Sequence, residues 1–216
     1  MKHGAIFDMD GTLLDTERLY QNTWVELAKE FGQTPEPAFP RAVCGSSGEH
    51  MLEIIRTYYP DVDAQQFMDS CYARVAQAVE TSIPKKPGME EILSYLRGHG
   101  VKLAVASSNA HTQIEKNLRL AGVLDYFDAV VGGDEVENSK PAPDIFLLAA
   151  QRIGCAPEDC YVFEDGANGI HAGAAAGCAT VMIPDLTPPT EELRTVCTAV
   201  CESLSAVRIA IETGEL

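Results

Sequence analysis

The sequence predicts an α/β protein whose core is a doubly wound parallel sheet, interrupted after its first strand by an all-helical domain. Three observations predict this fold. Short apolar segments alternate with helical patterns from residue 89 onward. A further apolar segment stands alone at 4–9, and only helical patterns occur over 15–82. Strands that alternate with helices form βαβ units, whose right-handed crossovers cover both faces of a parallel sheet.

The N-terminal strand, expected at 4–9, leads directly into a block of helices. Helical spacing begins at 15–32, and two further helices are expected at 48–59 and 64–82. The apolar side chains that share one face of the first helix are Leu19, Trp24, Leu27 and Phe31. We therefore expect Trp24 to lie in the core of the helical block.

The segment IPKKPGM, residues 83–89, marks a change of pattern, because two prolines and a glycine favour a boundary. After it, helices are expected at 89–98, 110–121, 143–153 and 167–176. The matching strands are expected at 101–107, 129–132, 161–164, 180–183 and 199–201. With the first strand they form a Rossmann-like core domain over 1–14 and 84–216, and the inserted helical domain covers 15–83.

Composition narrows the classes of function. The chain has 216 residues, 46% of them hydrophobic, and a formal net charge of −16. Such a surface repels nucleic acid and anionic lipid, so neither is an expected partner. An anionic substrate would need local cations from lysine, arginine or a metal ion. No apolar run approaches the length of a transmembrane helix, and the first apolar stretch is too short for a signal peptide.

The cysteines indicate the redox compartment. There are seven, scattered along a chain without a signal peptide, and Cys197 and Cys201 have no neighbouring ligands that would complete a zinc site. This usage favours free, buried thiols over a disulfide framework. We therefore expect a cytoplasmic protein.

Polar and charged side chains follow four of the predicted strands. In chain order they are Asp8 and Asp10, then Ser107, Ser108 and Asn109, then Ser139 and Lys140, and finally Glu164 and Asp165. Because the carboxyl ends of parallel strands share one edge of a sheet, these side chains should lie close together, where open α/β sheets bind ligands. Any one of these groups could belong to an ordinary turn, but four such strand ends together predict a site.

The chemistry of these groups favours Mg²⁺, which binds a few carboxylates together with phosphate and water. Four carboxylates and a phosphate dianion carry more negative charge than one Mg²⁺ and Lys140 can balance. Either Asp10 is protonated, or backbone N–H groups help to stabilise the remaining negative charge. Without a metal, clustered carboxylates should have raised pKa values. A calcium loop is excluded, because its glycine and glutamate positions hold Leu13 and Leu19.

The glycines of GANGIHAGAAAG could belong to a cofactor-binding loop or to a helix. No G-x-G-x-x-G or P-loop motif follows the first strand, so a dinucleotide or P-loop site is excluded there. Gly169, Gly173 and Gly177 recur every four residues. This spacing predicts a helix face of small residues that packs on the sheet.

The set Asp8-x-Asp10-Gly11-Thr12, Ser107, Lys140 and Glu164-Asp165 resembles the haloacid dehalogenase superfamily. The stretches SKPAPDIF (139–146) and FEDGANGI (163–170) resemble its β-phosphoglucomutase-like group, which carries a helical (C1-type) cap after the first strand. The resemblance covers essentially the whole chain.

The resemblance implies a role for each residue. Asp8 would attack phosphorus to form an aspartyl-phosphate, and Asp10 would act as the general acid and then the general base. The other implied roles are phosphate binding by Ser107, Ser108 and Lys140, and Mg²⁺ binding by Asp8, the Asp10 backbone carbonyl, Glu164 and Asp165. The Asp10 acid favours phosphoryl transfer over dehalogenation.

This chain differs from the mutases of the β-phosphoglucomutase-like group at two places, and both differences favour a phosphatase. Mutases that resemble this chain carry a histidine at the position of Tyr20, and a basic residue in the segment matched by residues 44–48, which has no cation here. Arg74 could substitute, although a solvated surface role is the simpler interpretation. Candidate substrate contacts are Thr16, Tyr20, Asn109 and the 44–48 loop.

We therefore expect a Mg²⁺-dependent phosphomonoesterase that acts on a small metabolite, such as a sugar or polyol phosphate. The alternatives are a sugar-phosphate mutase of the β-phosphoglucomutase type and a non-catalytic phosphometabolite-binding protein. We expect a monomer or a weak dimer.

Overall fold

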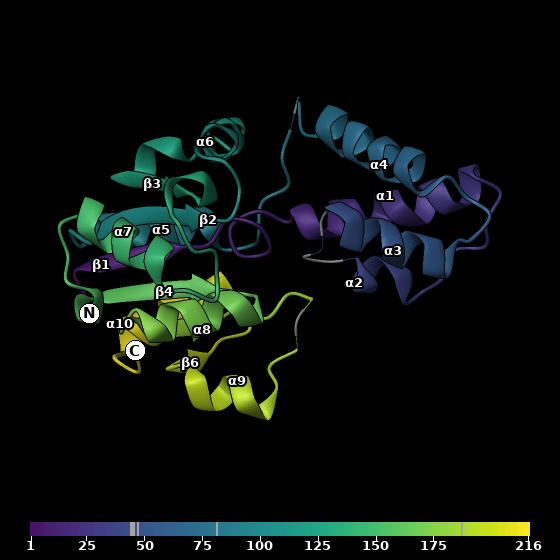
Figure 1. Ribbon diagram of the computed structural model, residues 1–216. Coiled ribbons are helices and arrows are strands. Elements are labelled where there is room, and N and C mark those ends of the chain that lie inside the picture. Colours follow the sequence, from purple (N-terminus) through teal and green to yellow (C-terminus); the bar gives the residue numbers. More distant parts are fainter. Residues whose placement is uncertain (44–45, 47, 81, 187) are drawn as a thin grey trace. The chain divides into compact units, whose positions relative to one another are not determined.

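The computed structural model describes residues 1–43, 46, 48–80, 82–186 and 188–216 (Figure 1). The chain divides into two compact units. The first unit joins Met1–Asp15 to Pro84–Leu216, and the second unit is Thr16–Ile83. No helix in the described part of the chain is both long and apolar enough to cross a membrane.

The first unit is built on a six-stranded sheet. In chain order its strands are β1 (Gly4–Phe7), β2 (Lys102–Ser107), β3 (Ala129–Gly132), β4 (Cys160–Glu164), β5 (Ala179–Met182) and β6 (Ala199–Val200). Their spatial order is β3-β2-β1-β4-β5-β6, and every neighbouring pair is parallel. The predicted parallel sheet is confirmed. Strand β1 ends at Phe7, earlier than predicted, so both aspartates of the motif lie beyond it.

Helices flank this sheet, as the prediction of an α/β fold requires. Those that follow the predicted pattern are α5 (Met89–Gly98), α6 (His111–Leu120), α7 (Asp144–Arg152) and α8 (Ala167–Ala175). One core cluster joins Ile6, Ala104 and Val162 of the sheet to side chains of α7 and α8. Alternate residues of the same strands face the other way. On that side Phe7 and Phe163 pack with their ring centroids 4.7 Å apart.

Two C-terminal helices were not predicted. They are α9 (Glu191–Val196) and α10 (Leu204–Thr213), and each begins at a side-chain cap. Thr190 Oγ1 accepts from the backbone N–H of Leu193, and Ser203 Oγ accepts from that of Ala206, both at 3.2 Å. Such caps satisfy backbone donors that a helix leaves unpaired at its start.

The second unit consists of helices with connecting turns over its described residues. They are α1 (Thr16–Glu30), α2 (Phe39–Ala42), α3 (Gly48–Tyr58) and α4 (Ala64–Ala78). Trp24 is 2% exposed and packs against Phe39 and Phe67, which confirms its predicted core position. The short α2 was not predicted.

The cysteines match the prediction of free, buried thiols in part, because Cys155 and Cys201 are only partly buried. The six that the structure describes are free, and four of them are buried. Cys44 lies outside the described residues.

Residues 13–15 and 84–86 of the first unit, which adjoin the helical unit in sequence, are joined by hydrogen bonds and ion pairs. Asp15 N–H donates to the Pro84 carbonyl, and Lys86 N–H donates to the Leu13 carbonyl, both at 2.9 Å. The Lys86 ammonium also forms ion pairs with Asp185 at 2.7 Å and with Asp15 at 3.3 Å. These contacts fix residues 13–15 against 84–86 within the first unit.

Candidate active site

Asp8 and Asp10 lie on a tight turn that follows β1. The Asp8 N–H still donates to the Phe163 carbonyl of β4 at 2.9 Å, and the Met9 carbonyl accepts from both Leu13 and Leu14. Gly11 has a positive φ of 83°, which favours glycine. A β-carbon on Gly11 would also overlap the carboxylate of Asp165. The turn therefore brings the end of β1 close to the residue that follows β4.

Lys140 joins two of the predicted carboxylates. Its Nζ donates to Asp8 Oδ1 at 2.6 Å, to Glu164 Oε1 at 2.7 Å and to the Ala106 carbonyl at 3.2 Å. These three contacts use all three hydrogens of the ammonium group. The Lys140 side chain is only 6% exposed, and its Nζ lies 4.9 Å from the ring centroid of Phe146. The structure thus places Lys140 between Asp8 and Glu164.

The pKa values in this cluster depend on burial and on the crowding of charge. Burial raises the pKa of Asp8 to about 8; the charges of Glu164 and Asp10 also raise it, and the Lys140 ammonium opposes them. Burial alone would lower the pKa of Lys140, but the carboxylates of Asp8 and Glu164 raise it above its ordinary value. Lys140 is therefore charged at neutral pH, and the remaining negative charge calls for another cation or a proton.

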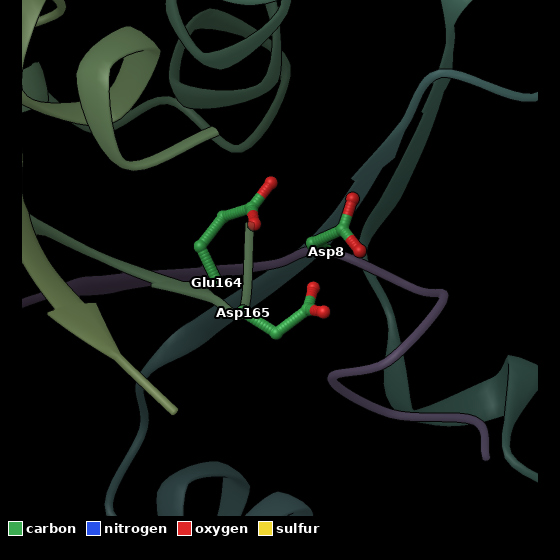
Figure 2. Close-up of side chains that lie close together, drawn as sticks. All are labelled: Asp8, Glu164 and Asp165. Carbon is green, nitrogen blue, oxygen red and sulfur yellow. The ribbon is translucent and has the colours of Figure 1, made fainter. Parts of the chain in front are cut away.

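Three carboxylates of the cluster form a candidate metal site. Asp8, Glu164 and Asp165 each offer an oxygen, and these three atoms lie within 4.8 Å of one another. Figure 2 shows the three carboxylates gathered in one place at the ends of β1 and β4. An all-oxygen donor set of carboxylates suits Mg²⁺, which completes its shell with water or phosphate. The Asp10 side chain is not among the three; its predicted contribution is the backbone carbonyl.

Glu164 is held at both of its oxygens. Oε1 accepts from Lys140, and Oε2 accepts from the backbone N–H of Gly166 at 2.8 Å. Helix α8 passes directly beside it, and a β-carbon on Gly169 would overlap the Glu164 carboxylate. A β-carbon on Gly173 would lie 2.7 Å from Thr180 Oγ1 and 3.0 Å from a Val162 methyl carbon.

The predicted packing of a small-residue face on the sheet is therefore confirmed at Gly173. At Gly169 the missing side chain instead leaves room for the Glu164 carboxylate of the candidate metal site. The prediction is wrong for Gly177. That residue lies beyond α8 with a φ of +83°, and a β-carbon there would meet nothing within 4 Å. Its glycine satisfies a left-handed turn rather than a packing contact.

The loop after β2 carries the next predicted group. Ser107 is buried and Ser108 is exposed. Asn109 Nδ2 donates to Asp10 Oδ2 at 2.5 Å and to Ser107 Oγ at 3.3 Å. The structure therefore places Asn109, predicted as a substrate contact, against Asp10.

The candidate residues of the helical unit are described within that unit alone. Thr16 is buried, and Tyr20 packs edge-on against Tyr72 with centroids 6.2 Å apart. Arg74 donates two hydrogen bonds to Glu30, at 2.8 and 2.7 Å, so its charge is already paired there. Residues 44, 45 and 47 of the predicted 44–48 loop lie outside the described residues.

Sequence reasoning missed two features of the site. The first is the hydrogen bond from Asn109 to Asp10, which joins two strand ends that are far apart in the chain. The second is the close approach of Gly169 to Glu164. A signal for the second was present, since a glycine inside a helical pattern often has a packing or functional reason.

Comparisons with known proteins agree with this fold. The model of the haloacid dehalogenase-like hydrolase family matches residues 5–183. A fructose-1-phosphate phosphatase of Escherichia coli is 37% identical over 180 residues, which cover 82% of this chain and 94% of that protein. A phosphorylated carbohydrates phosphatase of Thermotoga maritima is 32% identical over 174 residues, with 80% and 81% covered.

A solved structure extends the likeness to the whole chain. It is a HAD family hydrolase from Deinococcus radiodurans with bound phosphate and sodium; it is 27% identical, has a TM-score of 0.84, and covers 100% of this chain and 97% of its own. The chain thus belongs to the haloacid dehalogenase-like hydrolases. Within that superfamily it falls in the group that resembles β-phosphoglucomutase, as the motifs predicted.

Proposed function

We propose that this protein is a Mg²⁺-dependent phosphatase that hydrolyses the phosphate monoester of a small metabolite, such as a sugar or polyol phosphate. The observation that carries the proposal is the buried contact of Asp8 with Lys140, beside Glu164 and Asp165. This cluster combines a nucleophile, a fixed cation and an acidic metal site at one sheet edge. The names of the E. coli and T. maritima phosphatases support the choice of substrate class.

In the first step, a carboxylate oxygen of Asp8 forms a bond to phosphorus while the bond from phosphorus to the leaving oxygen breaks. Asp10 gives its proton to that oxygen, so the product leaves as an alcohol. The Ser107 hydroxyl donates to a phosphoryl oxygen. As Asp8 attacks, Lys140 exchanges its hydrogen bond to Asp8 for one to a phosphoryl oxygen and keeps its contact with Glu164. The two donors hold the phosphoryl group in line for attack.

In the second step, water attacks the aspartyl-phosphate and Asp10 accepts its proton. Inorganic phosphate is released, and the Asp8 carboxylate is restored. Mg²⁺ held by Asp8, Glu164 and Asp165, with the Asp10 carbonyl, would neutralise the charge of the phosphoryl group.

Contacts within the helical unit weigh against the mutase alternative. A mutase must bind a second phosphate, and Arg74, the predicted substitute cation, is already paired with Glu30. Tyr20, at the position where mutases carry histidine, offers an aromatic ring beside Tyr72. The cytoplasmic location, the monomeric or weakly dimeric state and the role of the helical unit as a cap remain predictions from the sequence.

The test is phosphate release from a panel of sugar, polyol, nucleotide and short-acid phosphates. Each assay is run with Mg²⁺ and with a chelator, beside the Asp8→Asn variant. We expect release that requires Mg²⁺ and is abolished in the variant. Undiminished release in Asp8→Asn would refute the mechanism. Interconversion of sugar-phosphate isomers without net release would favour the mutase, and tight binding without turnover would favour the binding protein.

A further inference from the structure

We propose that Asn109 is a positioning residue for Asp10, and that it orients the Asp10 carboxyl for protonation of the leaving group. This inference rests on the proposed phosphatase function and deepens it. It also changes the role expected for Asn109, from substrate contact to support of the general acid.

The amide group of Asn109 makes two contacts at the site. Its Nδ2 donates to Asp10 Oδ2 at 2.5 Å and to Ser107 Oγ at 3.3 Å. An amide nitrogen carries two hydrogens, and this orientation gives each of them an acceptor. The opposite orientation would turn the amide oxygen toward the Asp10 carboxylate.

The contact favours one oxygen of Asp10 as the holder of a proton. Oδ2 accepts the amide hydrogen, and the carbonyl oxygen of a protonated carboxyl is a better acceptor than its hydroxyl oxygen. The contact therefore favours placing the proton of the acid form on Oδ1. A carboxyl group with one oxygen held this way presents a single orientation for proton transfer, which depends steeply on geometry.

The same amide also orients Ser107. Ser107 Oγ accepts from both the backbone N–H and the Nδ2 of Asn109, each at 3.3 Å. Both lone pairs of the hydroxyl are then occupied, so its own hydrogen must point elsewhere. A hydroxyl oriented in this way is a donor for a phosphoryl oxygen.

Asn109 can support Asp10 because its own backbone is tied to the neighbouring strand. The Asn109 carbonyl accepts from the Gly133 N–H, just beyond β3, at 2.8 Å. Two residues later, the His111 N–H donates to Asp134 Oδ1 at 2.9 Å and starts α6. Asp10, by contrast, lies on the turn after β1. Asn109 thus links the general acid to the ends of β2 and β3.

The inference predicts a dependence on the leaving group. An alkoxide needs protonation as it departs, whereas nitrophenolate departs without it. The value of kcat/KM reports the steps through the release of the alcohol, before the aspartyl-phosphate is hydrolysed. Loss of the Asn109 amide should therefore lower kcat/KM for a sugar phosphate and spare kcat/KM for p-nitrophenyl phosphate.

The experiment measures kcat/KM for both substrates in the wild type, Asn109→Ala, Asn109→Leu and Asp10→Asn. Asn109→Leu keeps the approximate shape of the side chain and removes the donor without adding a charge, so it serves if the alanine variant folds poorly. Asn22→Ala, at an exposed asparagine of α1, is the matched control. For the Asn109 variants we expect a loss of about 10–100-fold with the sugar phosphate and less than about threefold with the aryl phosphate.

Asp10→Asn should show the same selectivity with a larger loss. Equal losses on both substrates in the Asn109 variants, or no loss on either, would overturn the role of Asn109 while leaving the phosphatase function in place. Absence of Mg²⁺-dependent phosphate release in the wild type would overturn both proposals.

Discussion

Gly169 lies so close to Glu164 that a β-carbon at this position would occupy the space of the Glu164 carboxylate. Helix α8 starts three residues after β4 ends, and its first turn passes beside Glu164, one of the three carboxylates of the candidate metal site. Only glycine at 169 lets Glu164 accept from both Lys140 and the Gly166 N–H. The absence of a side chain at Gly169 therefore allows Glu164 to keep its position in the site.

The first prediction concerns this contact. Gly169→Ala should displace Glu164, lower the free energy of unfolding by about 1–3 kcal/mol and reduce phosphate release at least tenfold. Gly166→Ala is the matched control, because its β-carbon would lie 3.5 Å from Glu164 Oε2, an ordinary contact distance. Denaturant unfolding and phosphate release measure both effects. Equal behaviour of the two variants would contradict the account of Gly169.

The second prediction concerns the metal. Mg²⁺ well above its dissociation constant should raise the melting temperature of the wild type by about 5 °C, because binding to the folded state stabilises it. Asp165→Asn removes one carboxylate of the candidate site and should abolish most of this shift. Thermal melts with and without Mg²⁺ test this without any substrate. A shift of the same size in the variant would place the metal elsewhere.

The third prediction concerns Lys140. Lys140→Met leaves Asp8 and Glu164 buried without their cation, which should lower the free energy of unfolding by about 3–5 kcal/mol in the absence of metal. Replacing Glu164 with glutamine in the same chain removes one of the uncompensated charges and should recover part of that loss. Urea unfolding of the single and double variants, in chelator, measures the recovery. If the double variant were less stable than Lys140→Met, Lys140 would not stabilise the fold by neutralising Asp8 and Glu164.

The fourth prediction concerns pH and lies outside the active site. Hydrogen bonds from Arg152, the Gly132 N–H and His111 hold the pKa of Glu135 at about 2, below its ordinary value of 4.5, although burial acts in the opposite direction. A lowered pKa means that the ionised group stabilises the fold above about pH 4.5. That contribution is lost as the pH falls toward 2.

Glu135→Gln should therefore cost about 1–2 kcal/mol at pH 7, with allowance for the partial exposure of the pair, and much less near pH 2. Urea unfolding across this range measures the difference, and Glu137→Gln, at a nearby exposed glutamate, is the control. A difference between wild type and Glu135→Gln that does not shrink in acid would refute this origin of the stability.

Much of the fold could be predicted from sequence, since its signals are local. Residues 89–98 and 129–132 match α5 and β3 residue for residue, because helical spacing and a short apolar run each stand between clear turn signals. Helix α10 was missed although Leu204, Val207 and Ile211 follow helical spacing. Its N-cap, Ser203, was the available signal.

The chemistry of the site was also predictable as a set of residue types at strand ends, but its contacts were not. Whether Asn109 faces a phosphate or Asp10 depends on how β1 pairs with β2, which aligns Phe7 with Val105. That register is a tertiary property and leaves no local pattern. The approach of Gly169 to Glu164 likewise depends on where α8 starts after β4.

The central claim is that Asp8 attacks phosphorus and carries it as an aspartyl-phosphate. The stereochemical course at phosphorus tests this claim most directly, with a substrate whose phosphorus is made chiral by sulfur and oxygen-isotope labels. Two successive in-line displacements, first by Asp8 and then by water, predict net retention of configuration. Net inversion would mean that water attacks the substrate in a single step, and it would contradict the role assigned to Asp8.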